Sequence, residues 1–229
     1  MLKLTGGRLP GRIPMTVHKN LQEQVKHYYR EVENYDWTRA ADAFIGLESF
    51  FHRSRCKETL RLVAQFVRQG RVLDVGCGTA LITRRLPGVP VGVDLNPRNL
   101  RKARVYAPKA RLVLCDVEGT LAFRENSFDA AVCTEILEHL LEPFEALREV
   151  QRVLKPRGVL IGSVPGRSPI WKLRGLSSSR GAFRNEPYHK HYRREELRRL
   201  LTQYFAIRQL YARNLQMNWF FAAHSLKGA

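Results

Sequence analysis

VLDVGCGTA, residues 72–80, is the segment from which the interpretation of this 229-residue chain starts. Its apolar first half is typical of a buried strand, and Gly76 and Gly78 then allow the backbone to turn tightly and to approach a ligand closely. We predict that a helix over residues 80–86 follows, with free N–H groups at its N-terminus that attract a negative group. The segment therefore predicts a strand, a ligand-binding turn and a helix, in that order.

From Arg71 onward, short apolar runs alternate with helical stretches. This alternation is typical of βα units that build a parallel sheet, and the last two apolar runs, 205–212 and 215–224, suit an antiparallel hairpin. We therefore predict an α/β fold with a seven-stranded, mostly parallel sheet and an antiparallel terminal hairpin. The other expected strands span 71–75, 89–94, 110–115, 128–133 and 158–164, and the expected helices span 97–107, 142–154 and 194–204.

The N-terminal part of the chain has a different character. Two helical patterns, over residues 17–34 and 47–67, precede the first strand. We divide the chain into a helical N-terminal lid or extension, residues 1–54, and a ligand-binding domain, residues 55–229. The second part carries a basic insert, residues 166–191, after the fifth strand.

The formal net charge of +18 is concentrated near the end of the chain, because residues 166–229 contain 13 Lys and Arg but only 3 Asp and Glu. Such a field attracts RNA, anionic lipid headgroups or an acidic small substrate, although a solvated basic surface is the alternative. The sequence has no apolar run of membrane-spanning length and no apolar secretion signal at its start. We expect a cytoplasmic protein, with peripheral attachment to a membrane as a second option.

Asp94 ends the second predicted strand in VGVDLNP, residues 91–97. A carboxylate there accepts hydrogen bonds from both ribose hydroxyls of a bound nucleoside, whereas the alternative is a helix cap ahead of Pro97. The sixth position of a dinucleotide-binding GxGxxG pattern would be Leu81 here, so the spacing favours S-adenosylmethionine over a nicotinamide dinucleotide.

Three further segments follow in order. In LVLCDVEG, residues 112–119, Asp116 is placed to accept a hydrogen bond from an adenine amino group, and Val117 to pack on the ring. The others are NSFDAAVCTEILEHL, residues 126–140, and RVLKPRGVLIGSVP, residues 152–165, each of which contains a strand that ends at the ligand edge of the sheet.

With these five motifs, the chain resembles the class I, Rossmann-like S-adenosylmethionine-dependent methyltransferases, particularly the small-molecule group that includes the ubiquinone-biosynthesis O-methyltransferases. The resemblance covers residues 55–165 closely and is looser from His191 onward. Two departures are Ala80, where the family usually has a third glycine, and Arg157, which replaces the first glycine of the usual LKPGG turn. The resemblance implies a cofactor site made by Asp74, Gly76, Cys77 and Gly78 around the methionine moiety, Asp94 and Leu95 at the ribose, Asp116 and Val117 at the adenine, and Thr134 beside the sulfonium.

The best candidates for catalysis lie in TEILEHL, where Glu135, Glu138 and His139 would share one face if the segment were helical. The pattern resembles the metal-binding ExxEH of related O-methyltransferases, in which a downstream histidine, here His189 or His191, completes the site. Many related enzymes carry this pair without a metal, so we assign no metal ion. We take His139 as a candidate base and Glu135 as its catalytic companion.

We predict methyl transfer to a small, hydrophobic or anionic acceptor resembling a quinone or lipid precursor. An anionic membrane surface is a second, optional partner in this prediction. Two alternatives stay open: an RNA methyltransferase that binds RNA with its basic last quarter, and a cofactor-binding partner subunit without catalysis. The tyrosines Tyr28, Tyr29 and Tyr35 suit either a lid over the site or simple packing between helix and sheet.

Overall fold

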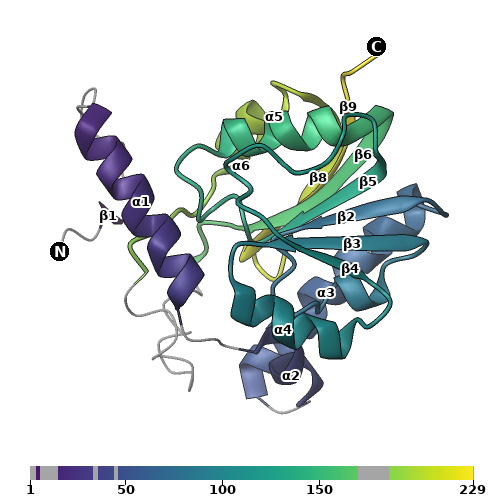
Figure 1. Ribbon diagram of the computed structural model, residues 1–229, viewed down its shortest axis with the longest axis horizontal. Coiled ribbons are helices and arrows are strands. Elements are labelled where there is room, and N and C mark those ends of the chain that lie inside the picture. Colours follow the sequence, from purple (N-terminus) through teal and green to yellow (C-terminus); the bar gives the residue numbers. More distant parts are fainter. Residues whose placement is uncertain (1–3, 6–14, 33–35, 44–45, 170–185, 229) are drawn as a thin grey trace.

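The structure is a computed structural model that describes residues 4–5, 15–32, 36–43, 46–169 and 186–228. Its main sheet has seven strands in the order β4-β3-β2-β5-β6-β9-β8 (Figure 1). Strands β2 to β6 pair in parallel, whereas β9 runs antiparallel to both β6 and β8. The α/β class, the seven strands and the terminal hairpin are confirmed. The strands are β2 (Arg71–Val75), β3 (Val89–Asp94), β4 (Arg111–Leu114), β5 (Phe128–Thr134), β6 (Leu154–Pro165), β8 (Phe205–Arg213) and β9 (Asn218–Ser225).

Helices cover both faces of this sheet. Helices α3 (Gly46–Phe66) and α4 (Pro97–Tyr106) lie on one face, and α5 (Pro143–Val153) and α6 (Arg194–Leu201) lie on the other (Figure 1). The central strands are buried on both sides, which is why they read as continuous apolar runs. Leu62 of α3 is one of the fully buried side chains, and each such side chain stabilises the fold by about 1.5–3 kcal/mol.

The structure departs from the sequence prediction after β2, before α3 and at the start of β6. The helix expected at 80–86 is only the 3₁₀ turn η1 (Thr83–Arg85), because Ala80 has a φ of +68°, outside the helical range. A short helix, α2 (Trp37–Asp42), precedes α3 and was not predicted. Strand β6 begins at Leu154 rather than near residue 158, so it includes the turn-like residues ahead of its apolar core.

The N-terminal helix α1 (Met15–Glu31) stands outside both helical layers (Figure 1). The strand β1 (Leu4–Thr5) pairs in parallel with β7 (Tyr188–His189), so the start of the chain meets the end of the basic insert. The boundary proposed at residue 54 lies inside α3, which is one continuous helix.

Two sequence predictions fall on parts of the chain that the structure does not describe. Tyr35 lies outside the described residues, as do residues 170–185 of the basic insert. Within the described ranges, each helix is too short or too polar to span a membrane.

Candidate active site

The glycine turn after β2 is the first part of the site. Gly76 and Gly78 have φ values of +69° and +53°, a left-handed conformation that glycine adopts without steric cost. Ala80 adopts the same conformation at +68°, at a position where the resemblance to the methyltransferases implies a glycine. The N–H of Cys77 donates to the carbonyl of Val93 at 2.8 Å, so the turn is fastened to the neighbouring strand.

Asp94 joins this turn to the end of β3. Its carboxylate accepts hydrogen bonds from the N–H groups of Gly78 and Asn96, both at 2.8 Å, and from the side-chain amide of Asn99 at 3.2 Å. Burial raises the pKa of Asp94 above its ordinary value. The helix cap is Asn96, whose side chain accepts from the N–H of Arg98, so Asp94 is not the cap.

Asp116 stands two residues beyond β4 at the same edge of the sheet. Its carboxylate accepts from the N–H of Glu118 at 2.9 Å and forms an ion pair with Lys26 of α1 at 2.6 Å. Val117 beside it is buried, with 9% of its surface exposed. The two predicted adenine residues therefore lie together, with α1 over them.

Asp74 lies deeper than its neighbours in the predicted cofactor set. It is buried within β2, and the hydroxyl of Thr83 donates to it at 2.5 Å. Burial raises its pKa to about 7. Cys77 is also buried, whereas Leu95 and Thr134 are partly exposed at the carboxyl ends of β3 and β5.

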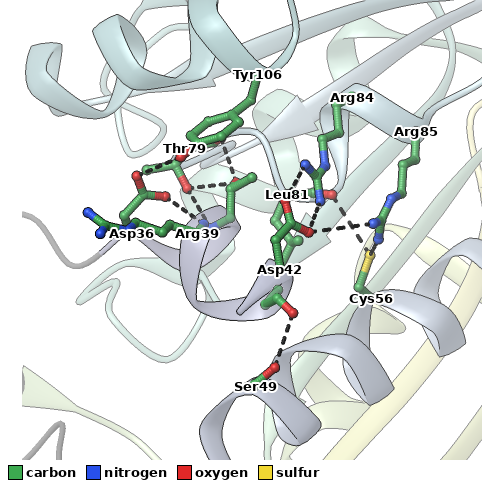
Figure 2. Close-up of polar contacts among 12 residues, drawn as sticks. Asp36, Arg39, Asp42, Ser49, Cys56, Thr79, Leu81, Arg84, Arg85 and Tyr106 are labelled. Atoms are coloured by element: carbon green, nitrogen blue, oxygen red, sulfur yellow. Dashed lines mark hydrogen bonds and ion pairs between the residues drawn. The ribbon is translucent and has the colours of Figure 1, made fainter. Parts of the chain in front are cut away.

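Helix α2 lies against the glycine turn. The hydroxyl of Thr38 donates to the carbonyl of Thr79 at 2.8 Å, and the N–H of Thr38 donates to the Thr79 hydroxyl at 3.1 Å. A side chain at Gly78 would meet the ring of Trp37 at 3.4 Å, so this ring lies beside the turn. Figure 2 shows α2 fastened at both ends, through Asp36 to Tyr106, and through Asp42 to Arg84.

We call the part of the site that follows β5 the acceptor side, and the part formed by the ends of β2, β3 and β4 the cofactor side. Glu135 is the first residue of the acceptor side. It has a φ of +54°, and residues 135–140 form a turn, so the helical face considered for TEILEHL does not exist. The carboxylate accepts from the hydroxyl of Ser163 at 2.8 Å and from the amide of Asn218 at 3.1 Å, and it pairs with Arg55 at 3.2 Å. Glu135 is therefore held by strands β6 and β9 and helix α3.

His139 lies at the end of the same turn. Its Nδ1 atom is 2.7 Å from the hydroxyl of Tyr29, and its Nε2 atom is 3.8 Å from a carboxylate oxygen of Glu138. Burial, together with the neighbouring His189 and Arg55, lowers the pKa of His139 well below its usual value. The imidazole is therefore neutral near pH 7 and able to accept a proton.

Three histidines line this side. The ring centroids of His139 and His189 are 5.0 Å apart, and those of His189 and His191 are 5.1 Å apart. Within the part of the chain that the structure describes, one group with metal-ligand geometry is His139, Glu186 and His189, whose ligand atoms lie within 4.8 Å of one another. Neither Glu135 nor His191 is in that group.

The residues of the cofactor side fit S-adenosylmethionine. Two carboxylates, Asp94 and Asp116, stand at the ends of adjacent strands. Three hydrogen bonds leave Asp94 one acceptor position for a ribose hydroxyl, and Asp116, with two partners, keeps acceptor positions for an adenine amino group. The bare Cα of Gly78 leaves an open approach to the backbone beside Trp37. The chemistry of this donor set matches a nucleoside with a charged amino-acid tail.

Sequence reasoning did not single out Asn96, Thr38 or Glu186. The pair Asn96-Pro97 is a recognisable helix start, and it was noted only as an alternative role for its neighbour Asp94. Thr38 carries no local pattern, because its partner Thr79 is distant in the chain. Glu186 contacts His189 only three residues further on, but this pair was not considered from the sequence.

Comparison with known families agrees with this site. Residues 73–162 match the family described as a methyltransferase domain. Together with the sheet order, this supports a class I S-adenosylmethionine-dependent methyltransferase enzyme with S-adenosylmethionine as its cofactor. The resemblance and the cofactor expected from the sequence are thereby confirmed.

The curated relatives that match this chain include ubiquinone biosynthesis O-methyltransferases. A ubiquinone biosynthesis O-methyltransferase of Xanthomonas oryzae pv. oryzae (strain PXO99A) is 37% identical over 106 residues, which are 43% of this chain and 44% of that protein. The protein of the same name from Cereibacter sphaeroides (strain ATCC 17025 / ATH 2.4.3) is 35% identical over 106 residues, 43% of this chain and 42% of its own length. The match therefore spans less than half the length of these relatives.

Solved structures share the fold. A protein from Pyrococcus horikoshii OT3 has a TM-score of 0.68 and 23% identity, and the match covers 87% of this chain and 98% of that one. The magnesium protoporphyrin IX methyltransferase from Synechocystis PCC 6803, solved with bound SAH, has a TM-score of 0.67 and 16% identity over 89% of this chain and 99% of its own.

Proposed function

We propose that the protein transfers a methyl group from S-adenosylmethionine to a hydroxyl oxygen of a small acceptor, hydrophobic or anionic, resembling a quinone or lipid precursor. The observation that carries this proposal is His139, a neutral imidazole in the turn after β5, at the sheet edge that also bears Gly78 and Asp94. The names of the curated relatives support a hydroxyl acceptor.

S-Adenosylmethionine, when bound, supplies a methyl group that is already activated for displacement. The chain has to orient the acceptor hydroxyl and accept its proton. The lowered pKa of His139 keeps the imidazole unprotonated near pH 7, so one ring nitrogen carries a lone pair that can take the proton of the acceptor hydroxyl. Glu135, held rigidly by Ser163, Asn218 and Arg55, would offer a fixed carboxylate to a polar group of the acceptor.

On the cofactor side, we assign the ribose to the carboxylate of Asp94 and the adenine amino group to that of Asp116. Support comes from their positions at the ends of β3 and β4 and from the hydrogen bond that joins Asp94 to the glycine turn. The remaining proposed contacts are Asp74, Gly76, Cys77, Gly78, Leu95, Val117 and Thr134.

We also propose that the protein works in the cytoplasm and meets hydrophobic acceptors at anionic membrane surfaces. The net charge of +18 supports this, because a strongly basic protein is attracted to anionic headgroups. The same charge would attract RNA, so the experiment must separate the two kinds of acceptor.

Purified protein, methyl-labelled S-adenosylmethionine and a cell extract are incubated together, and the label is separated into RNA, organic-soluble and small aqueous fractions. Label in the organic-soluble or small aqueous fraction supports the proposal. Label that ribonuclease releases would replace it with an RNA methyltransferase, and no label in any fraction would favour a cofactor-binding subunit without catalysis.

His139→Gln should lower the labelling rate at least about 100-fold, the usual contribution of a general base, without changing S-adenosylmethionine binding. His224→Gln is the matched control, because His224 pairs with Val159 near the opposite end of β6. Equal loss in both variants would contradict the role of His139. The proposal gives no step to a metal ion, so labelling should persist in EDTA.

A further inference from the structure

The hydroxyl of Tyr29, on α1, lies between an imidazole and a backbone carbonyl. It is 2.7 Å from Nδ1 of His139, and it donates to the carbonyl oxygen of Tyr188 at 3.2 Å. The rings of Tyr29 and His139 are in contact, with centroids 4.9 Å apart. These three groups come from α1, the turn after β5 and β7, so the contact closes the acceptor side of the site.

The Tyr29 hydroxyl, the His139 imidazole and the Tyr188 carbonyl have few protons to share between them. A tyrosine hydroxyl has one proton to donate, and a carbonyl oxygen can only accept. When Tyr29 donates to Tyr188, its oxygen must accept from the Nδ1–H of His139, which leaves the lone pair of the neutral imidazole on Nε2.

We propose that Tyr29 is the positioning residue of His139: its hydroxyl selects the Nδ1–H tautomer and so makes Nε2 the atom that takes the acceptor proton. This inference rests on the proposed function for its catalytic meaning, but the tautomer itself is a property of the protein alone. Tyr29 touches neither the cofactor carboxylates nor the reacting atoms, and it acts through His139.

Helix α1 is anchored so that Tyr29 stays in place. Lys26, one turn earlier, pairs with Asp116 at 2.6 Å, and the side-chain amide of Asn96 donates to the backbone carbonyls of Tyr29 at 3.0 Å and of Val32 at 3.3 Å. Asp116 and Asn96 border the predicted adenine and ribose positions. Helix α1, which carries Tyr29, is therefore held in place by residues of the cofactor side.

The charged and titratable groups around His139 come from several elements. Arg55 on α3, Glu138 in the same turn and His189 on β7 all act on its imidazole. Glu138 is almost fully buried, and its Oε2 atom has no hydrogen-bond partner. The hydrogen bond at Nδ1 is made with Tyr29 and not with these three groups. Tyr29 therefore acts directly on the nitrogen whose protonation defines the tautomer.

The direct test is ¹⁵N NMR of the protein with labelled histidine side chains, without any acceptor. We expect His139 to carry its proton on Nδ1 in the wild type, and Tyr29→Phe to move a large share of that proton to Nε2. A wild-type imidazole with the proton on Nε2, or an unchanged Nδ1–H tautomer in Tyr29→Phe, would overturn the inference. The His139→Gln variant assigns the signal.

Kinetics then separate positioning from structure. Phenylalanine keeps the ring packing of Tyr29 against Tyr28, whose centroid is 5.1 Å away, so Tyr29→Phe should fold and bind SAH as the wild type does. Its kcat should fall roughly 10-fold, a fraction of a general base's contribution, while KM for S-adenosylmethionine stays constant. The control variant Tyr204→Phe also removes a tyrosine hydroxyl, but at a position between α6 and β8. It should change neither kcat nor KM.

The two proposals can fail separately. If the extract experiment finds no methyl transfer, the NMR result still decides whether Tyr29 selects the tautomer. If methyl transfer is found but Tyr29→Phe leaves both the tautomer and kcat unchanged, the positioning role is wrong and the proposed function stands.

Discussion

The two sides of the site are assembled in different ways. Apart from Thr134 at the end of β5, the residues of the cofactor side lie within residues 71–117, in or directly after β2, β3 and β4. The acceptor side joins Tyr29 to His139 and Tyr188, partners that are 110 and 159 positions away. A local segment can be recognised from its own pattern, whereas a distant pairing depends on the whole fold. Changes on the cofactor side should therefore act on binding and stability, and changes on the acceptor side on turnover.

The largest effect is expected from Asp94→Asn. Both carboxylate oxygens of Asp94 accept from backbone N–H groups, those of Gly78 and Asn96, and an amide offers only one accepting oxygen. Loss of a charged hydrogen bond of about 2–3 kcal/mol should weaken S-adenosylmethionine binding on the order of 100-fold. Calorimetric titration with the cofactor measures this directly. Affinity within threefold of the wild type would show that Asp94 does not hold the ligand.

Gly76→Ala probes the place where the two sides meet. A Cβ at Gly76 would lie 2.0 Å from Cδ1 of Ile136, in the turn that leads to His139, and the φ of +69° disfavours alanine. Overpacking and strain should lower the free energy of unfolding by about 2–3 kcal/mol, measured by urea denaturation. Gly119→Ala is the control, because the nearest atom to its Cβ is 3.5 Å away. Similar losses in both variants would mean that neither the contact with Ile136 nor the left-handed backbone at Gly76 has a special cost.

Asp74 gives the cofactor side a pH dependence. Its folded-state pKa of about 7 lies above the ordinary value of 3.8, so the native protein binds this proton more tightly than the unfolded chain. Stability from this group is therefore greatest in acid and declines as pH rises to about 7. Between pH 5 and pH 8 the contribution of Asp74 to the free energy of unfolding should fall by about 2 kcal/mol, and Asp74→Asn should reduce the decline of the whole protein by that amount.

Asp129→Asn is the matched control for this experiment. Its hydrogen bonds to Lys155 and to the N–H of Arg71 lower the pKa of Asp129, so its contribution changes only at more acid pH. The decline between pH 5 and pH 8 should persist in this variant. A decline that becomes smaller in Asp129→Asn, or one that stays unchanged in Asp74→Asn, would assign this share of the pH dependence to another group.

The sequence predicted the parallel strands and the aspartates at their ends, because buried strands and glycine turns are local patterns. It did not predict that Ala80 prevents a helix after the turn, since a left-handed alanine is set by packing rather than by propensity. The sequence also could not show that Glu135 and His139 have different partners. In the structure a turn replaces the helical spacing, and Ser163 and Asn218 draw the carboxylate toward β6 and β9.

The smallest effect is expected from Arg157→Gly, away from both sides of the site. Arg157 has a φ of +59° and an exposed side chain, in the turn-like start of β6, where the resemblance to the methyltransferases implies a glycine. Glycine removes the left-handed strain and should raise the free energy of unfolding by about 0.5–1 kcal/mol in urea denaturation. Arg157→Ala removes the same charge but keeps Cβ, so it should give no such gain. Because the site lies at the other end of β6, near Pro165, neither variant should alter cofactor affinity, and an altered affinity would show that the two ends of this strand are coupled.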